Sequence, residues 1–256
     1  NNIDTMLLAG INANVDVTQI TIEEGKESKA DFLTKYMTTF VFLMMLLLVV
    51  VGTGGLLIRS LVEEKSNRLI EIIMSSCNPD QLLFGKVIGL SGLALTQVFI
   101  WTLVGIAILG NTLPTIISFE NIILIFFYFF FGFLFYTAMF VGFGSTVTTE
   151  QEAQSMTSYL TMLVIFPIVL AIPALQNPDF TAIKVMSYIP LTMPGTMILR
   201  INSAQIPTWE IILTMTILIV STYLMIWIAS KIFRIGILSY GKRPSFKEIF
   251  SWVRQK

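Results

Sequence analysis

The sequence predicts an all-α, polytopic membrane protein with five membrane-spanning helices. Of its 256 residues, 55% are hydrophobic and 12% are charged, whereas a soluble domain carries about twice that charged fraction. The hydrophobic residues also fall into blocks of roughly 20, the length of helix that crosses the hydrocarbon core of a bilayer. The mean hydropathy of +0.79 agrees with this class.

Residues 1–35 come before the first apolar block, and we expect them to be the end of an extracytoplasmic domain. The segment is polar, and the alternation of apolar residues over 14–22 predicts a short strand. The chain does not begin with methionine, and no signal-peptide pattern opens it. We therefore predict that it belongs to a longer protein, which has six spans if one further span precedes residue 1.

A transmembrane permease domain is predicted over residues 36–235. Its first span, 36–58, carries no charge. The second span, 82–109, contains three glycines spaced by four and three residues, which places them along one side of the helix. We predict that they form a packing stripe for another helix: Gly85, Gly89 and Gly92.

The later spans are less regular. The third, 122–143, is rich in phenylalanine, and the fourth, 159–175, contains Pro167 and Pro173, which predict a kink or a break. Residues 188–199 are too short and too broken by proline to span, so we expect a broken, re-entrant hairpin before the last span. The fifth span covers 209–229, and a cytoplasmic tail covers 236–256.

A charged stretch joins the first two spans. Residues 61–76 predict a short amphipathic helix, because apolar residues recur at helical spacing and charged ones lie mostly apart from them. Glu64 and Arg68 are four residues apart, in the favourable acid-first order. Asn78 is placed to cap the next helix, with Pro79 in its first turn.

The distribution of lysine and arginine orients the spans. With residues 61–76 in the cytoplasm, eleven of the sixteen basic residues lie inside and five outside, as the positive-inside rule favours. The outer ones are Lys26, Lys29, Lys35, Lys184 and Arg200. We therefore place residues 1–35 outside a cell membrane and the C-terminus in the cytoplasm.

Several kinds of chemistry are excluded. The chain has no histidine and a single cysteine, Cys77, so it has neither a Ser/His nucleophile nor a thiolate metal cluster. Gly85-Lys86 and Gly241-Lys242 lack the other residues of a phosphate-binding loop. The chain contains no cluster of basic residues interleaved with aromatic ones, which is the pattern that would suggest nucleic-acid binding. We predict a protein that is not an enzyme and binds no metal or cofactor itself.

Two motifs carry a family resemblance over residues 30–256. The stretch Glu63-Glu64-Lys65-x-x-Arg68-x-x-Glu71, with Ser75, Pro79, Leu82 and Gly85-Lys86 after it, resembles the first coupling region of ABC type-2 exporter permeases. The end of the chain, residues 231–245, is similar to the C-terminal signature of the sodium-efflux subgroup, the NatB-like proteins. Further residues fit this subgroup: Glu150, Glu152, Ala153, Gln154, Met193, Pro194, Met197 and Arg200.

The resemblance implies a separate ATP-binding cassette subunit, which holds ATP and Mg, and two permease subunits, identical or different, in each exporter. The residues expected to contact the ATPase subunit are Glu63, Glu64, Lys65, Arg68, Glu71, Glu150 and Glu152. For the helix at 63–71 the alternative is simple solvation at the membrane surface. For the two later glutamates the alternative is solvation of a tight turn.

Three other polar residues are candidates for the transport pathway. Gln97 and Thr102 lie deep in the second span, where the alternative role is hydrogen bonding between helices. Arg200 either anchors the chain at the membrane interface or closes an external gate. The basic tail is expected to meet anionic lipid.

We thus expect the membrane subunit of an ABC-type exporter, with sodium as the substrate implied by the resemblance. Alternatives are an exporter of drugs, peptides or lipids, and a non-transporting sensor or docking subunit. A secondary transporter is disfavoured because no ionisable residue lies in the middle of a predicted span.

Overall fold

A computed structural model describes residues 29–109, 119–169, 181–203, 206–239 and 248 of the chain. The described part is helical, without strands, which confirms the all-α prediction. Four of its helices are long and apolar enough to cross a membrane: α2, α4, α6 and α11. The helices are α2 (Lys29–Ser66), α3 (Leu69–Met74), α4 (Pro79–Leu109), α6 (Phe119–Gly144), α7 (Glu150–Val169), α9 (Thr181–Met186), α10 (Met193–Ser203) and α11 (Thr208–Gly236).

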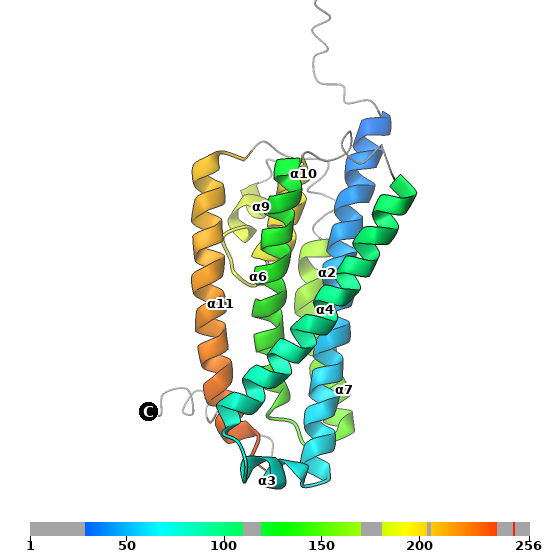
Figure 1. Cartoon of the computed structure of the whole chain (residues 1–256). Helices are drawn as coiled ribbons and strands as arrows, with labels where there is room; N and C mark the ends of the chain where they lie inside the picture. Colours follow the sequence, from blue (N-terminus) through cyan, green and yellow to red (C-terminus); the bar gives the residue numbers. More distant parts are fainter. Residues whose placement is uncertain (1–28, 110–118, 170–180, 204–205, 240–247, 249–256) are drawn as a thin grey trace, which may run out of the picture.

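α6 is the central helix of the bundle. α11 packs along one side of it and α2 along the other, while α10 covers its upper half (Figure 1). Close approach is possible because small residues lie at the contacts: a Cβ added to Gly132 would lie 2.4 Å from Pro194 of α10, and one added to Gly144 would lie 2.7 Å from Ile58 of α2. α4 crosses obliquely and packs less closely (Figure 1).

α2 is a single helix of 38 residues, longer than predicted. At about 1.5 Å per residue it is roughly 57 Å long, well beyond the hydrocarbon core of about 30 Å. The predicted division into a span ending at residue 58 and a separate helix over 61–76 is therefore wrong. No helix breaker lies between the two parts, and Leu61 and Val62 are buried, so the helix continues to Ser66.

The prediction for α4 is confirmed at its start. The helix begins at Pro79, and the backbone N–H of Asn78 donates to Gln81 Oε1 at 3.0 Å, so a side chain satisfies the N–H of the residue before the helix. α7 begins at Glu150, nine residues before the predicted start of the fourth span.

α7 also continues past Pro167 to Val169, so the helix is not broken at that proline. Pro173 and the predicted end of the fourth span lie outside the described residues. The same is true of the strand predicted over 14–22. The existence of five spans therefore stays a prediction. Four of the described helices qualify as membrane spans by length and composition.

Two short helices, α9 and α10, occupy the stretch before the last span, where a broken hairpin was predicted. Residues 193–201 of α10 are all buried. The insertion of this pair into the membrane stays a prediction.

α3, the start of α4 and the C-terminal end of α11 lie together at the lower end of the bundle, which we call the connector end (Figure 1). α9 and α10 lie toward the opposite end. The segments predicted to share one side of the membrane thus share one end of the molecule. Which end is cytoplasmic stays a prediction.

Candidate functional site

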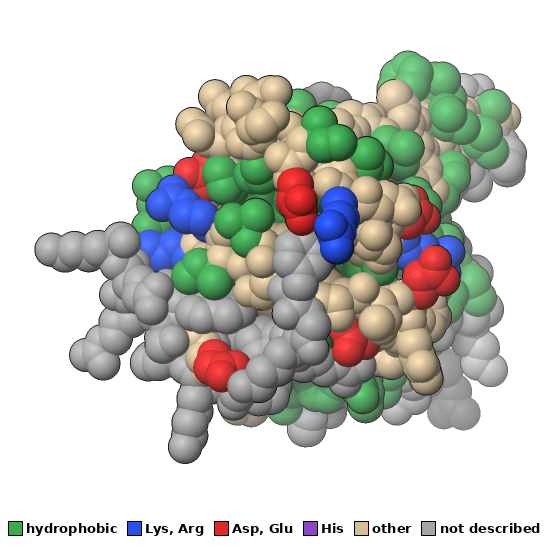
Figure 2. Space-filling view, turned by 90° about the horizontal axis from the view of Figure 1, so that it is seen from below, with side chains coloured by type: hydrophobic (Ala, Val, Ile, Leu, Met, Phe, Trp, Pro, Cys, Tyr) green, Lys and Arg blue, Asp and Glu red, His purple; other side chains and the backbone are tan. Residues whose placement is uncertain are grey.

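The connector end presents α3 as a short, exposed helix. Arg68 has a φ of 55° and lets the chain turn between α2 and α3. Ile70 is buried and attaches α3 to the bundle, whereas Leu69 and Ile72 are 44% and 67% exposed. Figure 2 shows this end of the molecule, with acidic and basic side chains spread among apolar ones. The surface offers both packing and charge to a partner.

The predicted coupling residues on α2 and α3 have different environments. Glu63, Arg68 and Glu71 are exposed. Glu64 is half-buried and forms an ion pair with Lys86 of α4, with 2.6 Å between Lys86 Nζ and Glu64 Oε1. The predicted helical pairing of Glu64 with Arg68 is wrong, because Arg68 lies in the turn after α2 ends.

Lys65 is buried at the connector end, with 2% of its surface exposed. Its ammonium donates to the backbone carbonyls of Ser145, of Gly236 at 2.7 Å and of Val147 at 3.2 Å. The donors of this side chain already have acceptors within the chain, and a contact of Lys65 with a partner stays a prediction.

Glu152 belongs to the cap of α7. Its backbone N–H donates to Thr149 Oγ1 at 3.2 Å, and its carboxylate accepts from the backbone N–H of Thr148 at 3.0 Å. This arrangement resembles a capping box, which satisfies donors at the start of a helix. Glu150, two residues earlier, is exposed. Of the two glutamates, Glu150 has the side chain available to a partner.

The glycine stripe of α4 makes no close helix contact within the described chain. A Cβ added to Gly85, Gly89 or Gly92 would meet nothing within 4 Å. Within the described residues the stripe faces open space, and its packing against another helix stays a prediction. Spacing along one helix shows that a face is smooth, but it does not show which face meets a neighbour.

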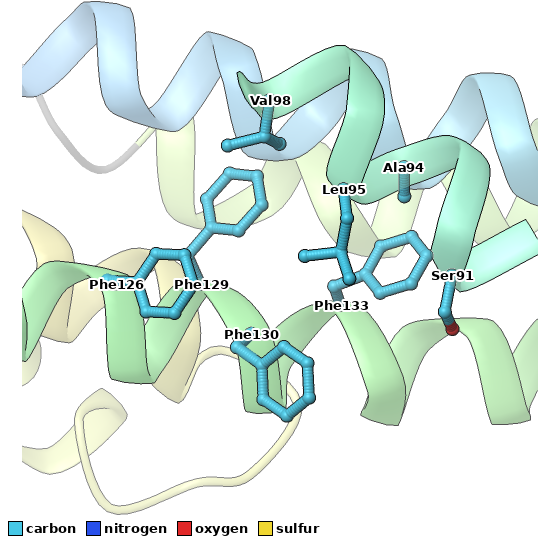
Figure 3. A pocket seen from close by; sticks show the side chains of 8 residues that line it. All are labelled: Ser91, Ala94, Leu95, Val98, Phe126, Phe129, Phe130 and Phe133. Atoms are coloured by element: carbon cyan, nitrogen blue, oxygen red, sulfur yellow. The ribbon is translucent and has the colours of Figure 1, made fainter. Parts of the chain in front are cut away.

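A small cavity of about 20 Å³ lies between α4 and α6 (Figure 3). Its lining is almost wholly apolar and includes four phenylalanines from α6: Phe126, Phe129, Phe130 and Phe133. Ser91 Oγ, on the α4 side, is buried and has no hydrogen-bond partner among the described residues. Such a lining accepts a hydrocarbon group rather than an ion.

A larger pocket of about 440 Å³ lies at the connector end between α2 and α4. One part of its lining is apolar, from Leu56, Leu57 and Leu90, and the other part is polar or charged, from Arg59, Ser60, Glu63 and Lys86. Among the described residues no group of three or more His, Cys, Asp or Glu is placed to hold a metal ion. The lining thus places hydrocarbon groups on one part of the pocket and charged groups on another.

The candidate pathway residues do not come together. Thr102 is exposed, and its hydroxyl donates to the Val98 carbonyl of its own helix at 2.8 Å. Gln97 is partly buried on the same helix. Neither lines the two pockets described above, and Arg200 lies on α10.

Arg200 forms a buried ion pair with Glu210 of α11; the two side chains are 6% and 0% exposed. Its guanidinium also donates to Ser187 Oγ at 2.7 Å. We call Ser187, Arg200 and Glu210 the outer clamp, because they tie α10 and the end of α9 to the start of α11. This burial makes a simple interface anchor a poor description of Arg200. Nearby, burial and the Glu210 carboxylate raise the pKa of the Tyr188 hydroxyl, which stays protonated.

Sequence reasoning missed two of these features, although signals for both exist. Glu210 stands at the start of an apolar span, ten residues after Arg200 and beyond Pro207, so opposite charges flank a turn. Lys65 follows Ile58, Leu61 and Val62 at the i+7, i+4 and i+3 positions of one buried face. That periodicity predicts an inward-facing lysine.

The helical bundle and its apolar spans define a multi-pass membrane protein. The chain belongs to the family of ABC-2 family transporter proteins, whose family model matches residues 1–231. Membership agrees with the predicted ABC type-2 permease and with a membrane transport component that is not itself catalytic. The assignment to a sodium-efflux subgroup stays a prediction.

Two relatives are similar over most of the chain. The uncharacterized protein MJ1024 of Methanocaldococcus jannaschii is 31% identical over 84% of this chain and 53% of its own length. The uncharacterized protein YhaP of Bacillus subtilis is 26% identical over 96% of this chain and 62% of its own length. The chain thus spans about half to three fifths of these relatives. No solved structure matches it significantly.

Proposed function

We propose that this chain is the membrane-spanning permease part of an ABC-type exporter, driven by a separate ATP-binding cassette subunit that docks at the connector end. The observation that carries the proposal is the exposed α3, with apolar Leu69 and Ile72 beside exposed Glu63 and Glu71. Apolar side chains supply packing energy to an interface, and charges supply orientation and specificity. As in similar permeases, two such subunits would form one exporter.

Charge reversal at α3 tests the docking. Glu63→Lys and Glu71→Lys in the full-length protein should release the co-purifying ATPase subunit, because like charges placed across an interface cost several kcal/mol. Both side chains are exposed, so the fold should be kept. The measurement is the ratio of the two subunits after affinity purification.

Glu120→Lys is the matched control, since Glu120 is exposed at the opposite end of the bundle. It should leave the ratio unchanged. Retention of the ATPase subunit by both variants, together with unchanged ATP-driven efflux, would sink the docking proposal. It would favour a helix that is only solvated at the membrane surface.

Sodium is the substrate that the family resemblance favours. The spans would have to offer it hydroxyl, amide and backbone carbonyl oxygens, since the described residues contain no acidic cage. The test is ATP hydrolysis by the reconstituted complex in proteoliposomes as sodium replaces potassium. Stimulation by sodium at constant ionic strength would support sodium export.

An exporter of amphiphiles is the second candidate, and the pocket between α2 and α4 favours it. Three leucines line one part of this pocket, and Arg59, Glu63 and Lys86 line another, which suits a hydrocarbon chain with a polar head. Stimulation of the same ATPase activity by a single-chain amphiphile, but not by sodium, would decide for this candidate.

A further inference from the structure

Lys65 makes a complete set of hydrogen bonds across three segments. An ammonium has three donors, and here they reach three backbone carbonyls, those of Ser145, Val147 and Gly236. Ser145 directly follows α6, Val147 lies in the turn before α7, and Gly236 is the last residue of α11. The last carbonyls of a helix have no partner within it and carry partial negative charge, so a buried cation is well placed at this junction.

The two helix ends touch where the ammonium is held. A Cβ added to Gly236 would lie 2.7 Å from Ser145 Oγ and 3.0 Å from the Ser145 carbonyl oxygen. The end of α11 therefore lies directly against the end of α6. Lys65 closes this contact from the side of α2, so three spans meet at one side chain.

Lys65 is also close in sequence to the exposed connector. The Asn67 N–H donates to the Glu63 carbonyl and the Arg68 N–H to the Lys65 carbonyl, both at 3.0 Å, and α3 begins at Leu69. A displacement of α3 must pass through this last turn of α2. The other lysine nearby, Lys86, joins α4 to Glu64 and Ser60 of α2 and, among the described residues, donates no hydrogen bond to α6 or α11.

We infer that Lys65 is a positioning residue that transmits displacement of α3 to the connector ends of α6 and α11. The inference rests on the proposed function, because it requires an ATPase subunit that moves α3. Without the ammonium, α3 and α2 would move while α11 stayed behind.

Two distances in the full-length complex test this. In a Cys77→Ser background reconstituted with its ATPase subunit, spin labels at exposed positions 76 and 120 report on the connector, and labels at exposed positions 238 and 120 report on the end of α11. In the protein that keeps Lys65, both distances should change on addition of ATP and Mg. In Lys65→Met, the 76–120 distance should still change and the 238–120 change should be lost.

Two further variants distinguish transmission from general damage. Lys65→Arg keeps a cation and should restore the 238–120 change at least in part, which a role in packing alone would not give. Lys231→Met removes a lysine of α11 whose ammonium lies 4.4 Å from the centroid of the Trp227 ring on the same helix, and it should leave both changes intact. If Lys65→Met does not fold, Gly236→Ala keeps the ammonium but forces α11 away from Ser145, and it should lose the 238–120 change.

If the 238–120 distance in Lys65→Met or in Gly236→Ala changed on addition of ATP and Mg as it does in the protein that keeps Lys65, the inference would be overturned. The docking proposal would stay intact. Absence of any ATP-dependent change at position 76 in the protein that keeps Lys65 would overturn both. The two failures are therefore distinguishable.

Discussion

α6 and α4 are both long apolar helices with glycines, yet they have opposite places in the molecule. In the most apolar stretch of α6, 56% of the residues are buried within the chain, against 6% in α4. The glycines of α6 allow contacts that a methyl group would block, whereas Gly85, Gly89 and Gly92 of α4 face open space. Hydropathy thus identifies a helix that suits a membrane, but it does not distinguish a central helix from a peripheral one.

Two of the ion pairs, both with a partner on α11, follow the same division. On the α6 side, the outer clamp fixes α10, which packs on α6, to α11 through two buried charges. On the α4 side, Asp80 pairs with Arg234 of α11 at 2.7 Å, with side chains 37% and 61% exposed. Burial should therefore set the contribution of each pair to stability.

The largest expected effect comes from breaking the buried pair. Arg200→Met leaves Glu210 charged and unpaired inside the protein, which should lower the free energy of unfolding by about 3–5 kcal/mol. Arg234→Met, at the exposed pair, should lower it by at most about 1 kcal/mol. Unfolding of both variants in mixed detergent measures the difference.

The double variant Arg200→Met/Glu210→Gln provides the control, because it removes both charges and should recover a large part of the loss. If Arg200→Met and Arg234→Met lowered the free energy of unfolding equally, the division into a buried and an exposed side would be contradicted.

A smaller effect is expected from single methyl groups. Gly132→Ala places a Cβ 2.4 Å from Pro194, and such overpacking should cost about 1–3 kcal/mol. The Cβ added by Gly89→Ala contacts nothing, so the free energy of unfolding should rise by up to about 1 kcal/mol from helix propensity. The measurement is the shift of the unfolding midpoint for each variant. A loss at Gly89 as large as that at Gly132 would show that another helix covers this face of α4 in the assembled protein.

The smallest effect is expected at Thr102 on the exposed helix. Thr102→Val removes only a hydroxyl bonded to its own helix, so the free energy of unfolding should stay within about 0.5 kcal/mol. The same variant is then assayed for export in proteoliposomes. Reduced export with unchanged stability would assign Thr102 to the pathway, and unchanged export would remove it from the candidates.

Much of the fold could be predicted because the signals are local. The apolar blocks place α4, α6 and α11, and the Asn78-Pro79 pair gives the start of α4. The charged stretch at 63–71 was found, but its division between the end of α2 and the short α3 was not. A charged turn at the end of a long helix and a separate amphipathic helix have the same composition, and burial of Leu61 and Val62 decided between them.

The sequence by itself determined the class of this protein, its apolar spans, the family resemblance and the charged connector. Each of these depends on neighbouring residues along the chain. Only the tertiary structure decided which carbonyls Lys65 reaches, that Arg200 meets Glu210 and that Gly132 rather than Gly89 makes a close contact. Lys65 bonds to carbonyls 80, 82 and 171 residues away. Such contacts arise when distant segments pack together, because burial then compels each charge to find a partner.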